Sequence, residues 1–285
     1  MKHNRVIAVA ATEFRRIFIN PRMLTVGMLL VFTYNLVITE LLMRADKTGL
    51  PVNVAESFVA VGSSGMLLMF LPSVFMILIS DFPDMGPHLL YSVHRAGRIS
   101  WLFGKLLAAL FSAVAYVGGM LAACCLMTAS NGFWGFEWSE TVTKYLSMFP
   151  NDQFTLMSQY LPSNLYNQMS FPYALLHTAL LLILYLFLLS LVIMFFRICG
   201  MKVAGIAASF AVVAAGVLTT AIHSDAMWAF PMANTITWLH YDTALREPVM
   251  PMYRSYIYFA VLIAIGLTAN IIAVKINNIN TMEAE

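Results

Sequence analysis

Residues 173–196 read YALLHTALLLILYLFLLSLVIMFF and contain no Asp, Glu, Lys or Arg. A helix needs about 20 consecutive, mainly apolar residues to cross the hydrocarbon core of a bilayer, so this stretch predicts a membrane-spanning helix. Because irregular backbone cannot face lipid, we expect helices in every stretch of this kind. The fold class predicted is an all-α polytopic membrane protein, a single transmembrane domain over residues 1–285. Its other five spans are residues 23–43, 59–80, 106–130, 203–222 and 255–274.

The composition agrees with that fold class. Hydrophobic residues make up 60% of the 285 residues and charged residues only 11%, whereas a soluble domain carries about 25% charged residues. This balance excludes an ordinary soluble enzyme, a disordered chain and a nucleic-acid binder. The three cysteines, two of them adjacent at Cys124 and Cys125, predict neither a disulfide framework nor a metal site.

The distribution of Lys and Arg predicts the orientation of the chain. Six spans put both termini on one side, and that side carries eleven of the basic residues against five on the other. The positive-inside rule therefore predicts cytoplasmic termini in a multi-pass protein of the plasma membrane. The exterior segments predicted are residues 44–58, 131–172 and 223–254. At the outer end of the first span, Glu40 and Arg44 are spaced for an ion pair on one helix.

Residues 4–19 predict an amphipathic helix that lies in the plane of the membrane. No cleavable signal peptide is predicted in this region, and Asn20-Pro21 ends the helix. The helix is either a simple anchor or an elbow, over residues 1–20, that transmits motion into the first span. Its predicted apolar face holds Val6, Ile7, Ala10, Phe14, Ile17 and Phe18, and its polar face holds Arg5, Thr12, Glu13 and Arg16.

The exterior segments are rich in aromatic residues. Such residues are either interfacial anchors, which Trp favours, or parts of an extracellular cap. Residues 226–246 predict one or two short helices that dip into the outer leaflet, between the fifth and sixth spans. The aromatic residues concerned are Trp134, Phe136, Trp138, Trp228 and Trp238.

The segment between the second and third spans, residues 81–105, reads DFPDMGPHLLYSVHRAGRISWLFGK. Asp84 or Asp81 can cap a short helix that runs through Leu90, and a basic turn with Arg95 and Arg98 follows. The pattern predicts a short helix parallel to the membrane on the cytoplasmic face.

This segment resembles the permease subunit of ABC-2 type exporters, which have an N-terminal elbow helix, six spans and a coupling helix between the second and third. The elbow matches at Glu13, Phe14, Arg15 and Arg16, followed by Asn20-Pro21-Arg22. Pro87 and the long 131–172 segment depart from the family. The loop matches in order at Asp84, Gly86, Leu89, Leu90, Ser92, Arg95, Arg98, Gly104, Lys105, Leu106 and Leu107.

The resemblance implies a transport subunit rather than an enzyme, with ATP and Mg²⁺ bound by a separate ATPase subunit and no cofactor in this chain. Gly104-Lys105 lacks the spacing of a P-loop. Two copies of this chain would assemble with two ATPase subunits in the lipid membrane. The residues implied in contact with the ATPase are Asp84, Gly86, Leu89, Leu90, Tyr91, Arg95 and Arg98.

The family also favours the second and fifth spans as walls of the pathway. In the second span, a soft face made of Ser64, Met66, Met69, Phe70 and Ser73 is the candidate substrate pathway. In the fifth, small residues permit close helix contact, either inside one subunit or across a dimer seam. The candidate seam residues are Ala204, Ala208, Ala211 and Ala215.

Other functions remain open from the sequence. Gly62-Ser63-Ser64-Gly65 matches the nucleophile pattern of rhomboid-like intramembrane serine proteases, with His177 as the base that Ser64 would need. A channel or a receptor-like scaffold without ATP coupling is a further alternative. For an exporter, the apolar second span and acidic exterior favour an amphipathic, cationic peptide of antimicrobial type, with a drug or a lipid as the alternative cargo.

Overall fold

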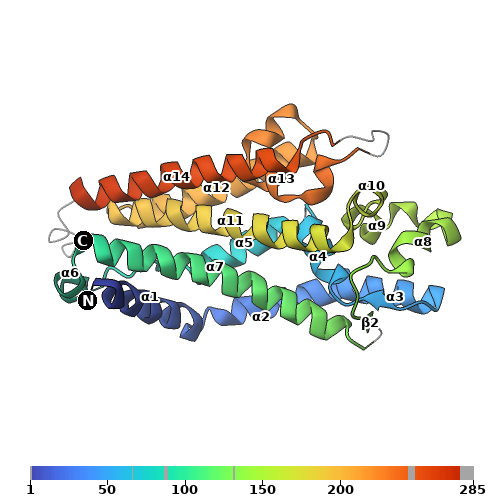
Figure 1. Ribbon diagram of the computed structural model, residues 1–285, viewed down its shortest axis with the longest axis horizontal. Coiled ribbons are helices and arrows are strands. Elements are labelled where there is room, and N and C mark those ends of the chain that lie inside the picture. Colours follow the sequence, from blue (N-terminus) through green and yellow to red (C-terminus); the bar gives the residue numbers. More distant parts are fainter. Residues whose placement is uncertain (1, 66, 87–88, 131, 243–247, 277–285) are drawn as a thin grey trace.

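The computed structural model describes residues 2–65, 67–86, 89–130, 132–242 and 248–276, and these are mainly helical (Figure 1). Within these residues, five helical stretches are long and apolar enough to cross a membrane. A bent pair, α4 (Glu56–Ser63) and α5 (Leu67–Leu78), makes a sixth if it counts as one span. The prediction of an all-α membrane protein is confirmed at this level. The five are α2–η1–α3 (Met23–Thr48), α7 (Arg98–Thr128), α11 (Phe171–Ile198), α12 (Lys202–Ala221) and α14 (Met252–Ile276).

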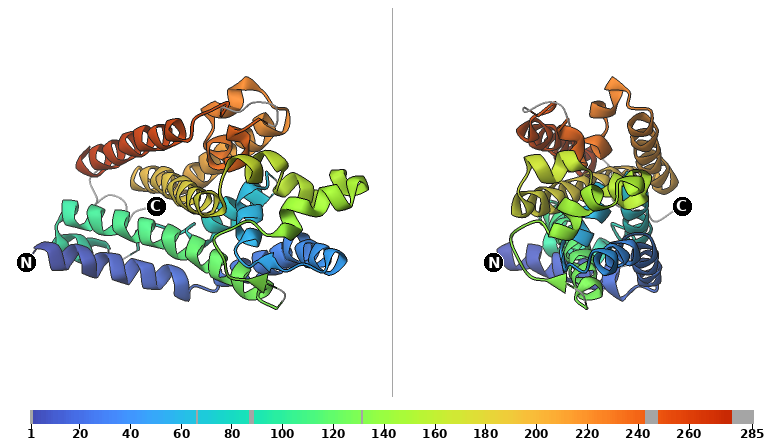
Figure 2. Two further views of the ribbon diagram at one scale, coloured as in Figure 1. Left: turned by 45° about the vertical axis from the view of Figure 1, so that its right-hand side comes forward. Right: turned by 90° about the vertical axis from the view of Figure 1, so that its right-hand side faces the viewer.

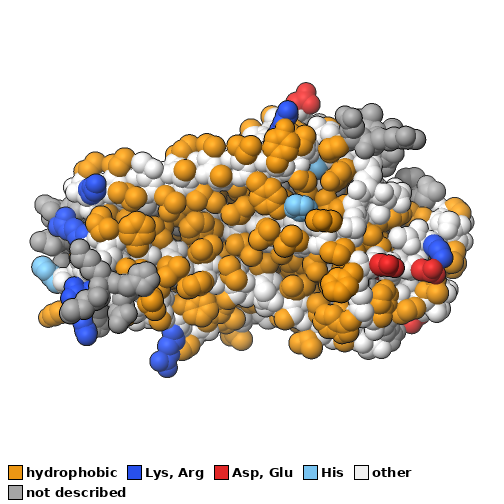
Figure 3. Space-filling view, viewed as in Figure 1, with side chains coloured by type: hydrophobic (Ala, Val, Ile, Leu, Met, Phe, Trp, Pro, Cys, Tyr) orange, Lys and Arg blue, Asp and Glu red, His pale blue; other side chains and the backbone are white. Residues whose placement is uncertain are grey.

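The long helices run along the long axis of the molecule, and its two ends differ (Figures 1 and 2). We call the end that holds the start of α1 (Lys2–Ile19), α6 (Leu89–Ala96) and the last turns of α14 the terminal end. The opposite end is the cap end. Lys and Arg side chains gather at the terminal end, and hydrophobic side chains cover the middle of the face in Figure 3, as expected for a bundle surrounded by lipid.

Residues 173–196, the most apolar stretch of the sequence analysis, belong to α11 at the centre of the bundle. Of the five spanning stretches it is the most buried, because 61% of its most apolar 18 residues lie inside the structure. It packs against α7, α12 and α14, and against the bent pair through α4. Its apolar side chains point in all directions because protein surrounds it on several sides.

The cap end is built from the segments predicted to be exterior. Strands β1 (Val52–Asn53) and β2 (Gly132–Phe133) pair in parallel and bring the first and second exterior segments together. The short helices expected between the last two spans are present. The short elements of this end are α8 (Glu140–Met148), η2 (Pro150–Phe154), α9 (Leu156–Tyr160), α10 (Ser163–Gln168), η3 (Asp225–Ala229), α13 (Pro231–Thr235) and η4 (Thr237–His240).

The second span differs from the prediction of one helix over residues 59–80. Its two halves, α4 and α5, meet at 87°. Ser64 is extended between them, with φ −77° and ψ 120°, and its hydroxyl accepts a hydrogen bond from the N–H of Leu67 at 3.2 Å. The Ser63 carbonyl, freed by the break, accepts from the Trp238 indole at 2.8 Å. A break at this depth is tolerated because a polar group of the cap pairs with the freed backbone.

Helix α1 forms where it was predicted, but its orientation differs. It runs lengthwise beside the first half of α7 rather than across the end of the bundle (Figures 1 and 2). The two helices approach closely at Gly104 of α7: a Cβ added there would lie 2.7 Å from Val9 and 3.0 Å from the Val6 carbonyl of α1. The buried side chains of α1 are Ala10, Glu13 and Ile17, whereas Ile7 is exposed. The buried face is therefore rotated from the predicted one, and Glu13 lies inside it.

Candidate coupling site

The segment that follows α5 is tied to two helices by Asp81. One carboxylate oxygen of Asp81 lies 2.6 Å from Arg22, just before α2, and the other accepts from Lys202 at 2.8 Å, at the start of α12. The hydrogen bond from Lys202, together with Arg22, holds the pKa of Asp81 below its ordinary value. One side chain thus joins the first, second and fifth spans at the terminal end.

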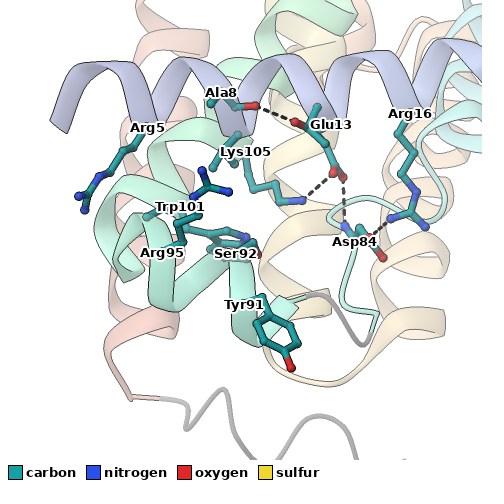
Figure 4. Close-up of a pocket in the computed structure, with 13 residues that line it drawn as sticks. Arg5, Ala8, Glu13, Arg16, Asp84, Tyr91, Ser92, Arg95, Trp101 and Lys105 are labelled. Atoms are coloured by element: carbon teal, nitrogen blue, oxygen red, sulfur yellow. Dashed lines mark hydrogen bonds and ion pairs between the residues drawn. The ribbon is translucent and has the colours of Figure 1, made fainter. Parts of the chain in front are cut away.

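Asp84 ties the same segment to α1. Its carboxylate forms an ion pair with Arg16, and its backbone N–H donates to the Glu13 carboxylate at 3.0 Å (Figure 4). The Asp84 carboxylate also accepts from the N–H of Gly86 at 3.0 Å. Asp84 and Gly86 therefore shape the loop before α6, and their contact with a partner stays a prediction.

A buried ion pair completes this network. The Lys105 ammonium lies 2.6 Å from the second oxygen of Glu13, and both side chains are almost fully buried between α1 and α7 (Figure 4). Sequence analysis named both residues but did not pair them, because Glu13 was assigned to a solvent face. Helices α1 and α7 meet at Gly104, which precedes Lys105 in the sequence. The small residue beside Lys105 was the signal that a helix packs closely there.

Helix α6 presents an exposed polar and aromatic face at the terminal end. Tyr91 is 78% exposed, and His94 and Arg95 are exposed as well, while Val93 and Ala96 are buried. Arg98, the first residue of α7, is exposed beside them. The structure thus leaves Tyr91, Arg95 and Arg98 accessible, as coupling residues need to be. The side chains of Leu89 and Leu90, and all of Pro87, lie outside the described residues. Of the elbow residues, Arg15 is exposed and Phe14 packs against Phe18 at a ring distance of 4.7 Å.

The candidate pathway residues do not form one open surface. Ser64 is buried at the break, and Ser73 donates to the carbonyl of Met69 at 2.6 Å. Phe70 packs edge-on against Phe32 of α2, with ring centroids 5.0 Å apart. Met66 lies outside the described residues. In this conformation the second span is packed against its neighbours.

The alanine stripe of α12 is not the face that packs inside the chain. The buried face consists of Gly205, Ser209, Val213, Gly216 and Thr220. On the stripe, Ala204 and Ala211 are exposed, while Ala208 and Ala215 are half-buried. The stripe is therefore available for contact with another helix.

The serine and histidine of the protease alternative have other partners. The His177 Nδ1 lies 2.6 Å from the Tyr256 hydroxyl, and the Ser64 hydroxyl caps α5. In the part of the chain that the structure describes, no hydrogen bond joins Ser64 to His177. The geometry gives this alternative no support.

Sequence analysis missed a buried carboxylate at the cap end. Glu56, at the start of α4, is fully buried, and it accepts from the N–H of Ser139 at 2.5 Å, the Ser139 hydroxyl at 2.7 Å and the N–H of Asn53 at 3.2 Å. It docks the long 131–172 segment onto α4. No sequence signal marked it, because it precedes the predicted span and its partner is 83 positions away.

The cap also binds the outer end of the first span. The Arg44 guanidinium donates to Thr155 at 2.5 Å and to Ser158 at 2.9 Å, and it lies 4.3 Å from the centre of the Tyr145 ring. The Glu40 carboxylate is 3.8 Å from Arg44, which agrees with the predicted ion pair. The 131–172 segment is therefore a docked cap rather than a free loop.

The described residues hold no group of three or more His, Cys, Asp or Glu side chains arranged to bind a metal ion. What the site offers is a set of charged contacts, centred on residues 81–86, that joins four helices beside an exposed short helix. Comparison with known proteins finds no match to this chain among protein-family models, curated proteins or solved structures.

Proposed function

We propose that this chain is the membrane-spanning subunit of an ATP-driven exporter, driven by a separate ATPase that contacts α6. The observation that carries the proposal is the arrangement of residues 81–86 and 89–96. Their first part is bound by ion pairs to α1, α2 and α12, and their second part, α6, has an exposed face. A segment that is held on one side and exposed on the other is suited to receive force from a partner.

The ion pairs give that force a route into the bundle. A displacement of α6 acts on Asp81 and Asp84, and through them on α2, α12 and α1. At the far end of α5, the break at Ser64 is held by Trp238 of the cap. Rotation at this break would move the cap relative to α5 and open the pathway face of Met69, Phe70 and Ser73.

Two copies of this chain with two ATPase subunits form the assembly that we propose. The outward alanine stripe of α12 supports a close contact between copies, because small side chains let helices approach in lipid. The cargo that we propose is an amphipathic, cationic peptide, with a drug or lipid as the alternative. Support comes from the half-buried Met69 and Phe70 and from the acidic Glu137, Glu140 and Asp152 of the exterior segment.

Site-specific photocrosslinking in native membranes tests the partner. A photoreactive phenylalanine analogue replaces Tyr91 in the full chain, and a second variant carries it at Trp134 of the cap end, which is 76% exposed. We expect position 91, and not position 134, to capture a protein with a P-loop ATPase sequence. Capture of no nucleotide-binding protein at position 91, or equal capture at both positions, would overturn the proposal.

A charge substitution tests the function of the contact. Tyr91→Asp should release the captured ATPase and stop peptide export, whereas Trp134→Asp should retain both. Because Tyr91 makes little contact with the rest of the chain, Tyr91→Asp should leave the melting temperature in detergent within experimental error. Unchanged ATPase retention in Tyr91→Asp would show that α6 is not the docking element.

A further inference from the structure

A cavity of about 700 Å³ opens at the terminal end between α1, α6 and the first turns of α7 (Figure 4). Arg5 comes from α1, Arg95 from α6, and Trp101 and Lys105 from α7. The volume is large enough for a small organic group, not only for an ion.

The lining of this cavity carries more positive than negative charge. The basic residues are Arg5, Arg16, Arg95 and Lys105, and the acidic ones are Glu13 and Asp84, which leaves an excess of two positive charges. Glu13 neutralises Lys105, and Asp84 neutralises Arg16. Within the described ranges, Arg5 and Arg95 have no ion pair, so the excess lies on these two guanidinium groups.

Trp101 lies in the wall of this cavity. The residue is only 1% exposed, and its indole N–H is buried without a hydrogen-bond partner in the described part of the chain. The guanidinium groups of Arg5 and Arg95 are donors only, so a ligand that pairs with them must bring acceptors and negative charge.

We infer that this cavity binds a phosphate group, carried by the headgroup of an anionic phospholipid. Guanidinium groups match phosphate oxygens with paired hydrogen bonds. Basic pockets beside spanning helices on the side with most Lys and Arg are suited to lipid headgroups. The exposed Ile7 of α1 and Ile99 and Phe103 of α7 lie on the helices that form the cavity, and they offer apolar surface to the acyl chains.

The inference needs no ATPase and does not depend on the proposed function. It gives Arg95 a different role from the coupling contact expected from the sequence. A lipid bound between α1 and α6 would also link the bilayer surface to the coupling site.

Native mass spectrometry of the purified full chain tests the inference. The protein is equilibrated with phosphatidylglycerol or with phosphatidylcholine of the same acyl chains, and bound lipid is counted. We expect the wild-type chain to prefer phosphatidylglycerol, and Arg5→Gln/Arg95→Gln to lose about tenfold in affinity for it.

The matched control is Arg15→Gln/Arg98→Gln, which removes two exposed arginines of the same end that do not line the cavity. It should retain the preference. Equal losses in the two double variants, or no preference in the wild type, would overturn the site. Binding of glycerol phosphate with no preference for phosphatidylglycerol would overturn the lipid as the source of the phosphate. A melting temperature for each variant confirms that it is folded.

Discussion

Two buried carboxylates hold the two ends of this molecule in different ways. Glu13, 5% exposed at the terminal end, faces the ammonium group of Lys105. Glu56, 0% exposed at the cap end, faces two backbone N–H groups and one hydroxyl, all uncharged. The first carboxylate belongs to a network of ion pairs, and the second to a closed set of hydrogen bonds.

The difference matches the surroundings of each end. Around Glu13, charges continue outward through Asp84 and Arg16 to the cavity and α6, where we propose that a lipid and a partner bind. Around Glu56, the contacts continue inward into the cap, which fixes the outer part of α4. The charged groups of the terminal end therefore reach the surface, whereas the hydrogen bonds around Glu56 are confined to the interior of the cap end.

The largest effect is expected from unpairing Glu13. Lys105→Met leaves a buried carboxylate without its partner, which costs about 3–5 kcal/mol, and Glu13→Gln/Lys105→Met should recover most of that loss. Thermal unfolding in detergent measures both variants. Lys144→Met, which removes an exposed lysine paired with Glu140, serves as the control. A double variant no more stable than Lys105→Met would show that the pair is not coupled.

Protonation of His240 should weaken the cap end in acid. Burial lowers the pKa of His240 to about 4, so between about pH 6.5 and pH 4 the unfolded chain binds a proton that the folded chain does not. The contribution of His240 to stability should fall by up to about 3 kcal/mol as pH decreases through this window. The stability of His240→Gln relative to the wild type should therefore rise as pH decreases. Identical slopes in the two proteins, measured by denaturant unfolding at each pH, would contradict the prediction.

The hydrogen bonds of Glu56 give the next test of the cap end. Glu56→Gln replaces one acceptor oxygen by an NH₂ group that would face the N–H and O–H donors around it. The mismatch should lower the free energy of unfolding by about 1–3 kcal/mol. We expect faster proteolysis within residues 140–168 in this variant. Glu140→Gln, which changes an exposed pair in the same segment, should cost less than about 0.5 kcal/mol. Equal protease sensitivity of the two variants would remove the special role of Glu56.

Close packing of α1 gives a matched pair of glycine variants at the terminal end. Gly104→Ala would place a Cβ 2.7 Å from Val9, while at Gly118 of the same helix a Cβ meets nothing within 4 Å. We expect Gly104→Ala to lose about 1–3 kcal/mol by overpacking and Gly118→Ala to gain up to about 1 kcal/mol. Melting temperatures that move in the same direction would contradict this packing.

The smallest effect is the acid response of Asp81. Its pKa is held below the ordinary value, so its ion pairs stabilise the folded chain above about pH 4 and lose that effect as pH falls further. Asp81→Asn should therefore differ from the wild type at pH 7, and the difference should shrink as the pH falls below about 4. The effect is small because the pair is partly exposed. Unfolding at each pH, measured by tryptophan fluorescence, checks this. A difference in stability between the two proteins that stays constant from pH 7 to pH 3 would contradict the role of the Asp81 ion pairs.

Much of the fold follows from the sequence because the bilayer is a severe constraint. The five long apolar helices, the short helices after α12, and the helical form of residues 4–19 all follow from apolar length and periodicity. The Glu40–Arg44 pair follows from helical spacing alone. Local rules predict these features because each depends on residues within a few turns of one another.

The features that sequence analysis missed depend on residues far apart in the chain. Nothing near Ser63 predicts that the Trp238 indole will accommodate a break at Ser64, and nothing near Glu13 predicts Lys105. Periodicity also assigned Glu13 to the polar face of α1, because a hydrophobicity pattern treats every carboxylate as exposed. It cannot show that a lysine far along the chain pairs with Glu13 in the interior.

The sequence by itself determined that this chain is a membrane-embedded protein, where its long apolar helices lie, and that a basic segment separates the second and third apolar stretches. Only the tertiary structure decided which way α1 faces, that the second stretch bends, and that Asp81, Asp84 and Glu13 form one network. The physical reason is that apolar burial is set by composition along the chain, whereas each polar group inside the bundle is stable only beside a partner that the fold brings to it.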